Sequence, residues 1–189
     1  MKLLSGLFCE PMVSVPAVFN IGDIAHALSN LGRFAGHSDR FFSAAEHAVL
    51  VSRELAEYGP ETRLYGLLNG APAAYLGDLP DSIKTHLPLF NKAERRIREA
   101  VMASFNVTVE TSASLVEEAQ GRVLAMELRE LLNASDEEIL NVWGLSPPGN
   151  RDQQPIGLLP FEAHGTFLKE YEKITRELKE ATGLTVKAG

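Results

Sequence analysis

The apolar residues of this chain recur mostly at intervals of three and four, the spacing that places them on one face of an α-helix. We find few runs of alternating apolar and polar residues and no internal repeat. The pattern predicts helices over residues 21–31, 43–58, 62–69, 71–76, 81–86, 91–105, 112–132, 136–142 and 161–181. We therefore predict an all-α fold, a helical bundle.

Local signals set several helix ends. Asn20 is suited to cap the helix over 21–31. Ser43, followed three residues later by Glu46, has the spacing of a capping box and is expected to open the next helix. Gly70 lies inside a helical stretch, where a glycine costs roughly 1 kcal/mol relative to alanine. It is expected to be a weak point in that helix.

The chain fits one domain of 189 residues, with a helical core over 20–132 and a proline-rich loop over 144–160. A closing helix over 161–181 is expected to pack back on the bundle. Its predicted inward-facing residues are Phe161, Phe167, Leu168, Tyr171 and Ile174.

Composition and charge narrow the classes of partner. The chain is 45% hydrophobic and 23% charged, as in ordinary globular proteins, and has a formal net charge of −7. This charge argues against duplex nucleic acid or an anionic membrane as the main partner. No run approaches the roughly 18 apolar residues of a membrane span, no secretory signal pattern is evident, and Cys9 is the lone cysteine. We expect a cytoplasmic location.

The segment over 67–78 carries the most specific pattern, Leu-Leu-Asn-Gly-Ala-Pro-Ala-Ala-Tyr-Leu-Gly-Asp. It resembles the HD-domain phosphohydrolases, with Asn69 and Gly70 at the positions of the metal-binding His-Asp pair and Ala73 at that of a catalytic Glu. The segments 21–29, 33–37 and 43–51 follow the order of the 5'-deoxynucleotidase-like branch. There, His47 matches the first metal ligand and Gln120 stands where the last ligand, an Asp, is expected. The resemblance implies an HD-domain-like bundle.

The matched positions lack most of the chemistry that a hydrolytic metal needs. Such an ion is held by several anionic or imidazole donors at about 2.0–2.2 Å, which then allow it to activate water. Asn69 and Gln120 offer neutral amides, Gly70 offers no side chain, and Ala73 cannot act as a general acid or base. We expect no catalytic residue, no metal and no cofactor. A relocated metal site built from His37, His47 and Asp78 is the alternative.

The resemblance also implies a ligand pocket. Its expected residues are Arg33, Phe34, His37, His47, Asp78 and Lys84. Arg33 resembles an arginine that contacts substrate phosphate, and a surface ion pair is its alternative interpretation.

Asp78 resembles an acidic residue that contacts the sugar or orients water, or it caps the helix that begins near Pro80. Lys84 reaches phosphate or lies on a solvated helix face. Arg40 could join a local cationic cluster, and Trp143 could wall a base pocket or simply contribute to packing. Glu94 and Glu127 are expected to pair with arginines.

Three functions remain open. The favoured one is a catalytically degenerate protein that binds a nucleotide or another phosphate-bearing small molecule without hydrolysing it. The second is a residual or altered phosphohydrolase that uses a divalent ion such as Mn²⁺, Co²⁺, Mg²⁺ or Zn²⁺. The third is a non-catalytic interaction subunit. The resemblance also implies a homodimer.

Overall fold

The computed structural model describes residues 1–16, 18–108, 113–146 and 154–182, and within these ranges the chain is helical and contains no β-strand. Two isolated bridges join Lys2 to Phe8 and Gly32 to Ser43. The prediction of an all-α fold is confirmed. The elements in order are α1 (Ile21–Asn30), η1 (Phe34–Gly36), α2 (Ala44–Glu54), η2 (Ala56–Tyr58), α3 (Gly59–Asn69), α4 (Ala73–Leu76), α5 (Asp81–Lys84), α6 (Pro88–Ser104), α7 (Ala113–Leu132), α8 (Asp136–Trp143) and α9 (Pro160–Thr182).

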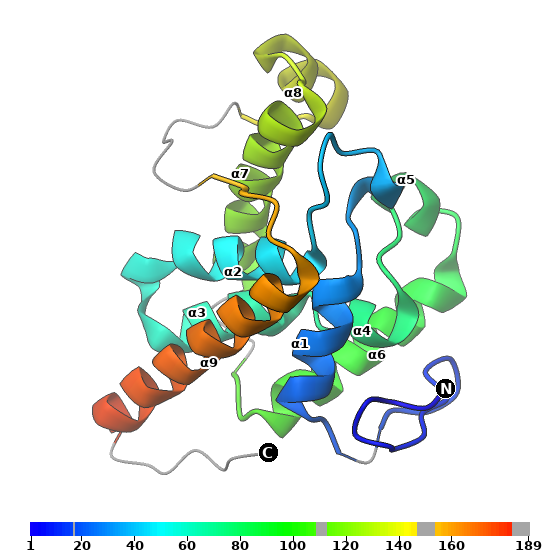
Figure 1. Ribbon diagram of the computed structural model, residues 1–189, viewed down its shortest axis with the longest axis vertical. Helices are drawn as coiled ribbons and strands as arrows, with labels where there is room; N and C mark the ends of the chain where they lie inside the picture. Colours follow the sequence, from blue (N-terminus) through cyan, green and yellow to red (C-terminus); the bar gives the residue numbers. More distant parts are fainter. Residues whose placement is uncertain (17, 109–112, 147–153, 183–189) are drawn as a thin grey trace.

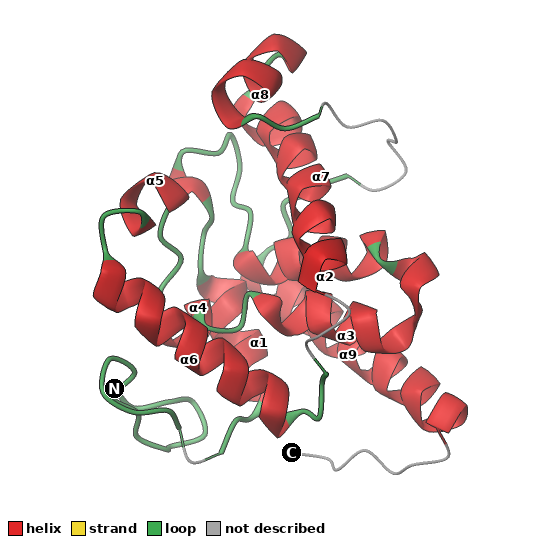
Figure 2. Cartoon of the chain, turned by 180° about the vertical axis from the view of Figure 1, so that it is seen from behind, coloured by secondary structure: helices red, strands yellow, loops and turns green. Residues whose placement is uncertain are grey.

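Helices α2 and α3 pack against each other at the centre of the molecule (Figure 1). Helix α9 crosses α1, α2 and α3, whereas α7 packs on α2 and α3 and continues outward to α8. Helix α6 packs on α3 and is best seen from behind (Figure 2). One hydrophobic core joins these helices, and its fully buried side chains include Phe42, Leu67, Ile97 and Phe167.

The cap predicted at Asn20 is present, whereas the capping box predicted at Ser43 is present only in part. The Asn20 side chain accepts hydrogen bonds from the backbone N–H groups at the start of α1, as predicted. Ser43 Oγ accepts from the backbone N–H of Glu46 at 3.1 Å, but the Glu46 carboxylate does not complete the capping box. It accepts instead from the backbone N–H groups of residues 156, 157 and 158, at 2.7, 3.1 and 2.8 Å. Glu46 therefore fastens the segment before α9 to α2.

Several helix ends differ from the prediction. Helix α2 ends at Glu54 and is followed by the short 3₁₀ turn η2. Pro60 lies in the first turn of α3, and Pro88 begins α6, where the missing N–H of proline removes no intrahelical bond. Helices α3 and α6 therefore begin about three residues earlier than the sequence pattern predicts.

Gly70 does not lie inside a helix, which corrects the prediction of a weak point there. It caps the C-terminus of α3 with φ −81° and ψ −2°, angles that any residue adopts. The backbone N–H of Ala73 bonds to the Gly70 carbonyl at 3.0 Å, and this turn leads into α4.

The closing helix packs on the bundle as predicted, with one exception. Phe167 and Ile174 are fully buried, and Leu168 and Tyr171 pack against the core. Phe161 is 86% exposed, because its side chain lies on the outer side of the first turn of α9, whose Ala163 is the residue buried in the core. The predicted loop over 144–160 is non-helical over 144–146 and 154–159, and residues 147–153 lie outside the described ranges.

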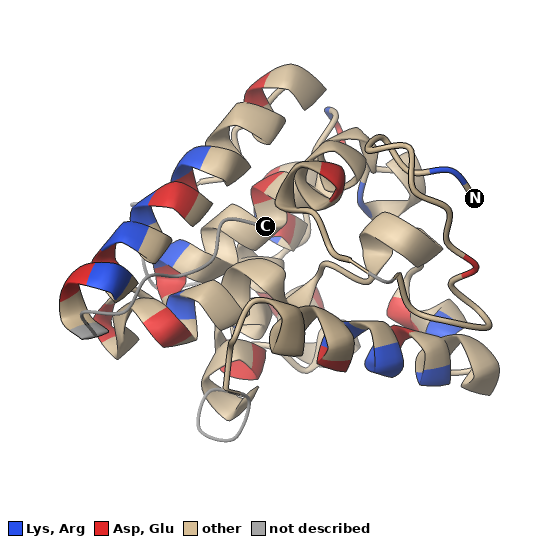
Figure 3. Ribbon diagram, turned by 90° about the horizontal axis from the view of Figure 1, so that it is seen from below, with Lys and Arg blue, Asp and Glu red and all other residues tan. Residues whose placement is uncertain are grey.

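Charged side chains reinforce the contact of α9 with α2 and α3. Arg63 of α3 is buried and donates to Glu170 at 2.7 Å and to Glu177 at 2.5 Å. Arg53 of α2 also contacts Glu170, at 3.3 Å. Basic and acidic residues are interspersed along α6 and α9 (Figure 3). Among the described helices, none is long and apolar enough to cross a membrane.

Candidate functional site

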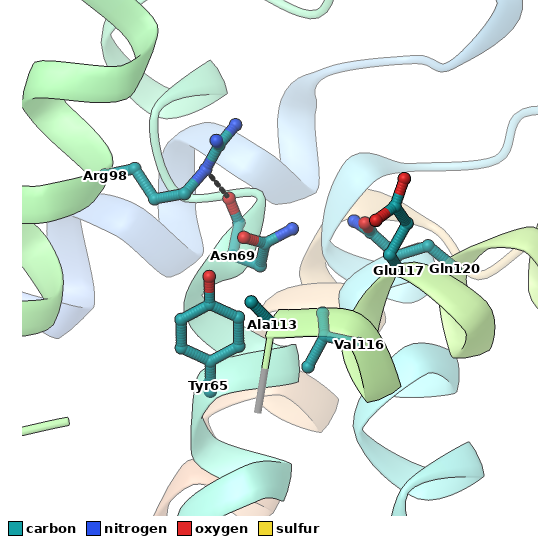
Figure 4. A pocket seen from close by; sticks show the side chains of 7 residues that line it. All are labelled: Tyr65, Asn69, Arg98, Ala113, Val116, Glu117 and Gln120. Atoms are coloured by element: carbon teal, nitrogen blue, oxygen red, sulfur yellow. Dashed lines mark hydrogen bonds between the residues drawn. The ribbon is translucent and has the colours of Figure 1, made fainter. Parts of the chain in front are cut away.

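A pocket of about 260 Å³ opens between α3, α6 and α7 (Figure 4). Asn69 and Gln120, which match two metal-ligand positions of the HD-domain pattern, both line it. The full lining is Tyr65, Asn69, Arg98, Ala113, Val116, Glu117 and Gln120. Helix packing thus brings two positions 51 residues apart in the chain to one pocket.

Helical spacing positions these side chains. Tyr65 lies one turn before Asn69 on α3, and Glu117 lies three residues before Gln120 on α7, so each pair shares a helix face. Glu117 and Gln120 stand together across the pocket from Asn69, and the hydroxyl end of Tyr65 points toward Asn69 (Figure 4). Packing of α3 against α7 brings the two faces together.

Arg98 enters the pocket from α6. Its Nε donates to the backbone carbonyl of Asn69 at 3.3 Å, which holds the arginine beside the end of α3. Its Nη2 lies 3.8 Å from a carboxylate oxygen of Glu94 on the preceding turn. Arg98 therefore brings a positive charge to a lining that also contains the negative charge of Glu117.

Gly70 and Ala73 leave room beside the pocket but add no donor atoms. A Cβ placed on Gly70 would meet no atom within 4 Å. Ala73 is the first residue of α4 and is partly buried. Position 70 therefore has open space for a Cβ.

His47 lies on α2 and does not line this pocket. Its Nδ1 is 2.6 Å from Oε1 of Glu127, a fully buried carboxylate on α7. The other oxygen of Glu127 accepts from Nε and Nη2 of Arg33, at 3.2 and 3.0 Å. The expectation that Glu127 pairs with an arginine is confirmed, and the same carboxylate holds His47.

Burial acts to raise the pKa of Glu127, but the attraction of Arg33 and His47, with the hydrogen bonds to both, outweighs it. The pKa of Glu127 is consequently below its ordinary range. The carboxylate is ionised at neutral pH, and its charge is balanced inside the protein.

Arg33 is held by two carboxylates. Besides Glu127, its Nη1 lies 3.8 Å from Asp78, and its side chain is only 16% exposed. The guanidinium also stacks over the Phe34 ring at 5.2 Å from the ring centre. Asp78 does not cap α5, whose N-cap position is Pro80. The structure thus brings Arg33, Phe34, Asp78 and His47 together around Glu127.

The turn that carries Arg33 has an unusual backbone. Phe34 and Ala35 have φ angles of 55° and 50°, which non-glycine residues rarely adopt. His37 follows this turn and is exposed. The strained turn directs the Arg33 side chain toward Glu127, while His37 remains outside the group.

The remaining candidate cations also have partners. Lys84 donates to Glu94 at 3.0 Å, and Glu94 is the residue that faces Arg98. Arg40 bonds to Asp39 at 3.0 Å and to the carbonyl of Pro155. Trp143 ends α8, is 44% exposed and does not line the pocket. Lys84 and Arg40 are therefore each engaged with a carboxylate of the protein.

Within the described ranges, no three or more His, Cys, Asp and Glu side chains are arranged to hold a metal ion. His37, His47 and Asp78 are all described, and they do not form such a group. The alternative set of metal ligands is therefore not assembled in this structure.

Sequence reasoning missed five of the seven lining residues: the polar or charged Tyr65, Arg98 and Glu117, and the apolar Ala113 and Val116. A signal for two of them existed, because Tyr65 and Glu117 share helix faces with Asn69 and Gln120. Arg98 carried no such signal, since it reaches the pocket only through the packing of α6 on α3.

No protein-family model matches the chain. It is 32% identical over 156 residues to the uncharacterized protein YfdR of Escherichia coli, an alignment that covers 82% of this chain and 84% of YfdR. It is also 27% identical over 157 residues to an uncharacterized protein of Rhodobacter capsulatus, covering 78% of this chain and 80% of that protein.

Proposed function

The chain belongs to the same family as YfdR, and for this family member we propose the binding of a nucleotide or another phosphate-bearing small molecule without metal-dependent hydrolysis. One observation carries the proposal. Asn69 and Gln120, which stand at metal-ligand positions of the HD-domain pattern, line one pocket with their neutral amides.

The residues of the pocket fit a bound organic molecule better than a catalytic metal. Amide oxygens are poor ligands for Zn²⁺, and they serve Ca²⁺ only where carboxylates add charge. Among the described residues of the lining, Glu117 is the one acidic residue, and none is a histidine or cysteine. An ion placed here would lack both the donors to hold it and a neighbouring base at Ala73.

The same residues supply what a polar ligand needs. Asn69 and Gln120 each offer a donor and an acceptor, Arg98 and Glu117 offer charged hydrogen bonds, and Tyr65 offers a hydroxyl. These groups come from three different helices, so the scaffold holds them in place before a ligand arrives.

The proposal is tested by thermal denaturation with nucleoside mono-, di- and triphosphates, each with EDTA and then with Mn²⁺, Co²⁺ or Mg²⁺. A ligand at about 100 times its dissociation constant adds roughly 2.7 kcal/mol, or several degrees in Tm. We expect stabilisation that needs no metal and that is lost in the double variant Asn69→Ala, Gln120→Ala. Stabilisation only with metal would point to a hydrolase instead.

A protein-interaction subunit is the second candidate, favoured by apolar side chains on the surface before and within α9. Ile156, Leu159 and Phe161 are 70%, 64% and 86% exposed. We include a homodimer and a cytoplasmic location in this proposal. No response to any nucleotide, together with a dimer mass by light scattering that Phe161→Ser converts to a monomer mass, would favour it over ligand binding.

A further inference from the structure

We infer that the pocket between α3, α6 and α7 recognises the uncharged ring of its ligand, a nucleobase-like heterocycle, and that an attached phosphate adds little to affinity. This inference rests on the proposed function and specifies which part of the ligand the pocket holds. It follows from the amides, the size and the charges of the pocket.

The amides of Asn69 and Gln120 suit the hydrogen-bonding edge of a heterocycle. Each presents an N–H₂ donor beside a carbonyl acceptor, and bases carry the same two kinds of group side by side along their edges. The two amides come from opposite sides of the pocket, as Figure 4 shows. A planar ring between them could bond to both.

The dimensions and walls fit a single ring system. The pocket volume of about 260 Å³ is below the roughly 300–1,000 Å³ typical of sites for drug-sized ligands. Val116 and Ala113 line the pocket on α7, where Val116 is buried, and the largely buried side chain of Tyr65 lies on α3. Such a site has room for a base, with the rest of a nucleotide left toward the opening.

The charges around the pocket do not favour a phosphate. Arg98 and Glu117 bring one positive and one negative charge to the lining, so their charges cancel. Arg98 also faces Glu94, which holds Lys84 at 3.0 Å. A phosphate monoester carries about −1.5 to −2 charges at neutral pH, so it would have to displace Glu94 and approach Glu117.

Arg33 does not supply the positive charge that a phosphate would need. Its guanidinium faces Glu127 at 3.0 Å and Asp78 at 3.8 Å, and Glu127 is fully buried. Moving Arg33 to a phosphate would leave a buried carboxylate with less compensation, which is costly. The guanidinium of Arg33, which the resemblance would assign to phosphate binding, is thus occupied by ion pairs within the protein.

The test is isothermal titration calorimetry in EDTA with adenosine, guanosine, cytidine and thymidine, their 5'-monophosphates, and inorganic phosphate. We expect at least one nucleoside to bind with an affinity within about threefold of its monophosphate, and inorganic phosphate not to bind. A monophosphate that binds thirtyfold or more tightly than its nucleoside would overturn the inference and leave the proposed function standing. If no compound binds, both are overturned.

Two variants separate the contribution of the ring to affinity from that of the phosphate. Asn69→Ala with Gln120→Ala should weaken nucleoside binding about tenfold or more, because the ring loses its hydrogen-bond partners. Glu94→Gln should leave the nucleoside affinity unchanged but strengthen monophosphate binding about fivefold, because Lys84 and Arg98 lose their carboxylate. Glu99→Gln, an exposed acid on the same helix, is the matched control. Equal effects of Glu94→Gln on both ligands would contradict the inference.

Discussion

The side chain of Glu46 shows how one residue can determine the position of a distant segment. Its carboxylate is buried on α2 and accepts three backbone N–H groups from residues 156–158. Gly157 fits this site because its φ is +82° and a Cβ there would lie 3.0 Å from the Phe41 carbonyl. Glu46 and Gly157 together set the approach to α9.

We expect Glu46→Gln to lower the free energy of unfolding by about 2 kcal/mol, because bonds to a charged acceptor contribute about 1.5–3 kcal/mol and the amide has one acceptor oxygen for three donors. Urea denaturation measures this loss. Glu162→Gln is the control, since the exposed Glu162 accepts one bond from the Leu159 backbone. Equal effects of both substitutions would show that the buried carboxylate has no special role.

At the scale of helices, the end of α3 shapes the pocket. The helix stops at Asn69, and Gly70 takes ordinary helical angles with open space around its Cα. The glycine therefore serves no conformational need at this position.

Gly70→Ala should raise the free energy of unfolding by about 0.4–1 kcal/mol, because alanine restricts the unfolded chain and its Cβ meets no neighbour. Differential scanning calorimetry should record an increase in Tm of roughly 1–4 °C. Gly66→Ala is the opposite case, since its Cβ would lie 2.6 Å from Leu55 Cδ1. A lower Tm for Gly70→Ala would mean that the space is filled in solution.

The predicted helices match the structure where apolar spacing determines them, as on α6 and α7. Ile97, Val101 and Ala119 are buried, because each lies on the apolar stripe of its helix. The sequence pattern predicts neither the end of α2 nor the exposure of Phe161, because both depend on which other parts of the fold cover each helical turn. Asn69 and Gln120 could be found from motif resemblance, but Arg98 could not, because its place depends on contact between helices distant in sequence.

For the whole molecule, buried ion pairs connect the central helices and make stability depend on pH. Glu127 connects α7 to His47 on α2 and to Arg33 in the segment before α2. The pKa of Glu127 is lowered in the folded state. A carboxylate with a lowered folded pKa contributes stability above its ordinary pKa of 4.5 and loses it as the pH falls through the folded value.

We therefore expect the free energy of unfolding to fall as the pH drops below about 4.5, the ordinary glutamate value. Chemical denaturation between pH 3 and 7 measures this dependence. Glu127→Gln should be less stable at pH 7 and lose less stability on acidification, because the titrating group is gone. A variant with the same acid slope as the parent would show that Glu127 does not contribute to it.

The most direct test of a ligand pocket lined by Asn69 and Gln120 is nitrogen-edited NMR of the side-chain amides in EDTA, as adenosine, guanosine, cytidine and thymidine are added in turn. We predict saturable shifts of the Asn69 and Gln120 side-chain resonances with at least one nucleoside. The Asn91 amide, which donates to the Lys84 carbonyl outside the pocket, should stay in place. Unchanged Asn69 and Gln120 resonances with every nucleoside, or shifts confined to other residues, would contradict the account.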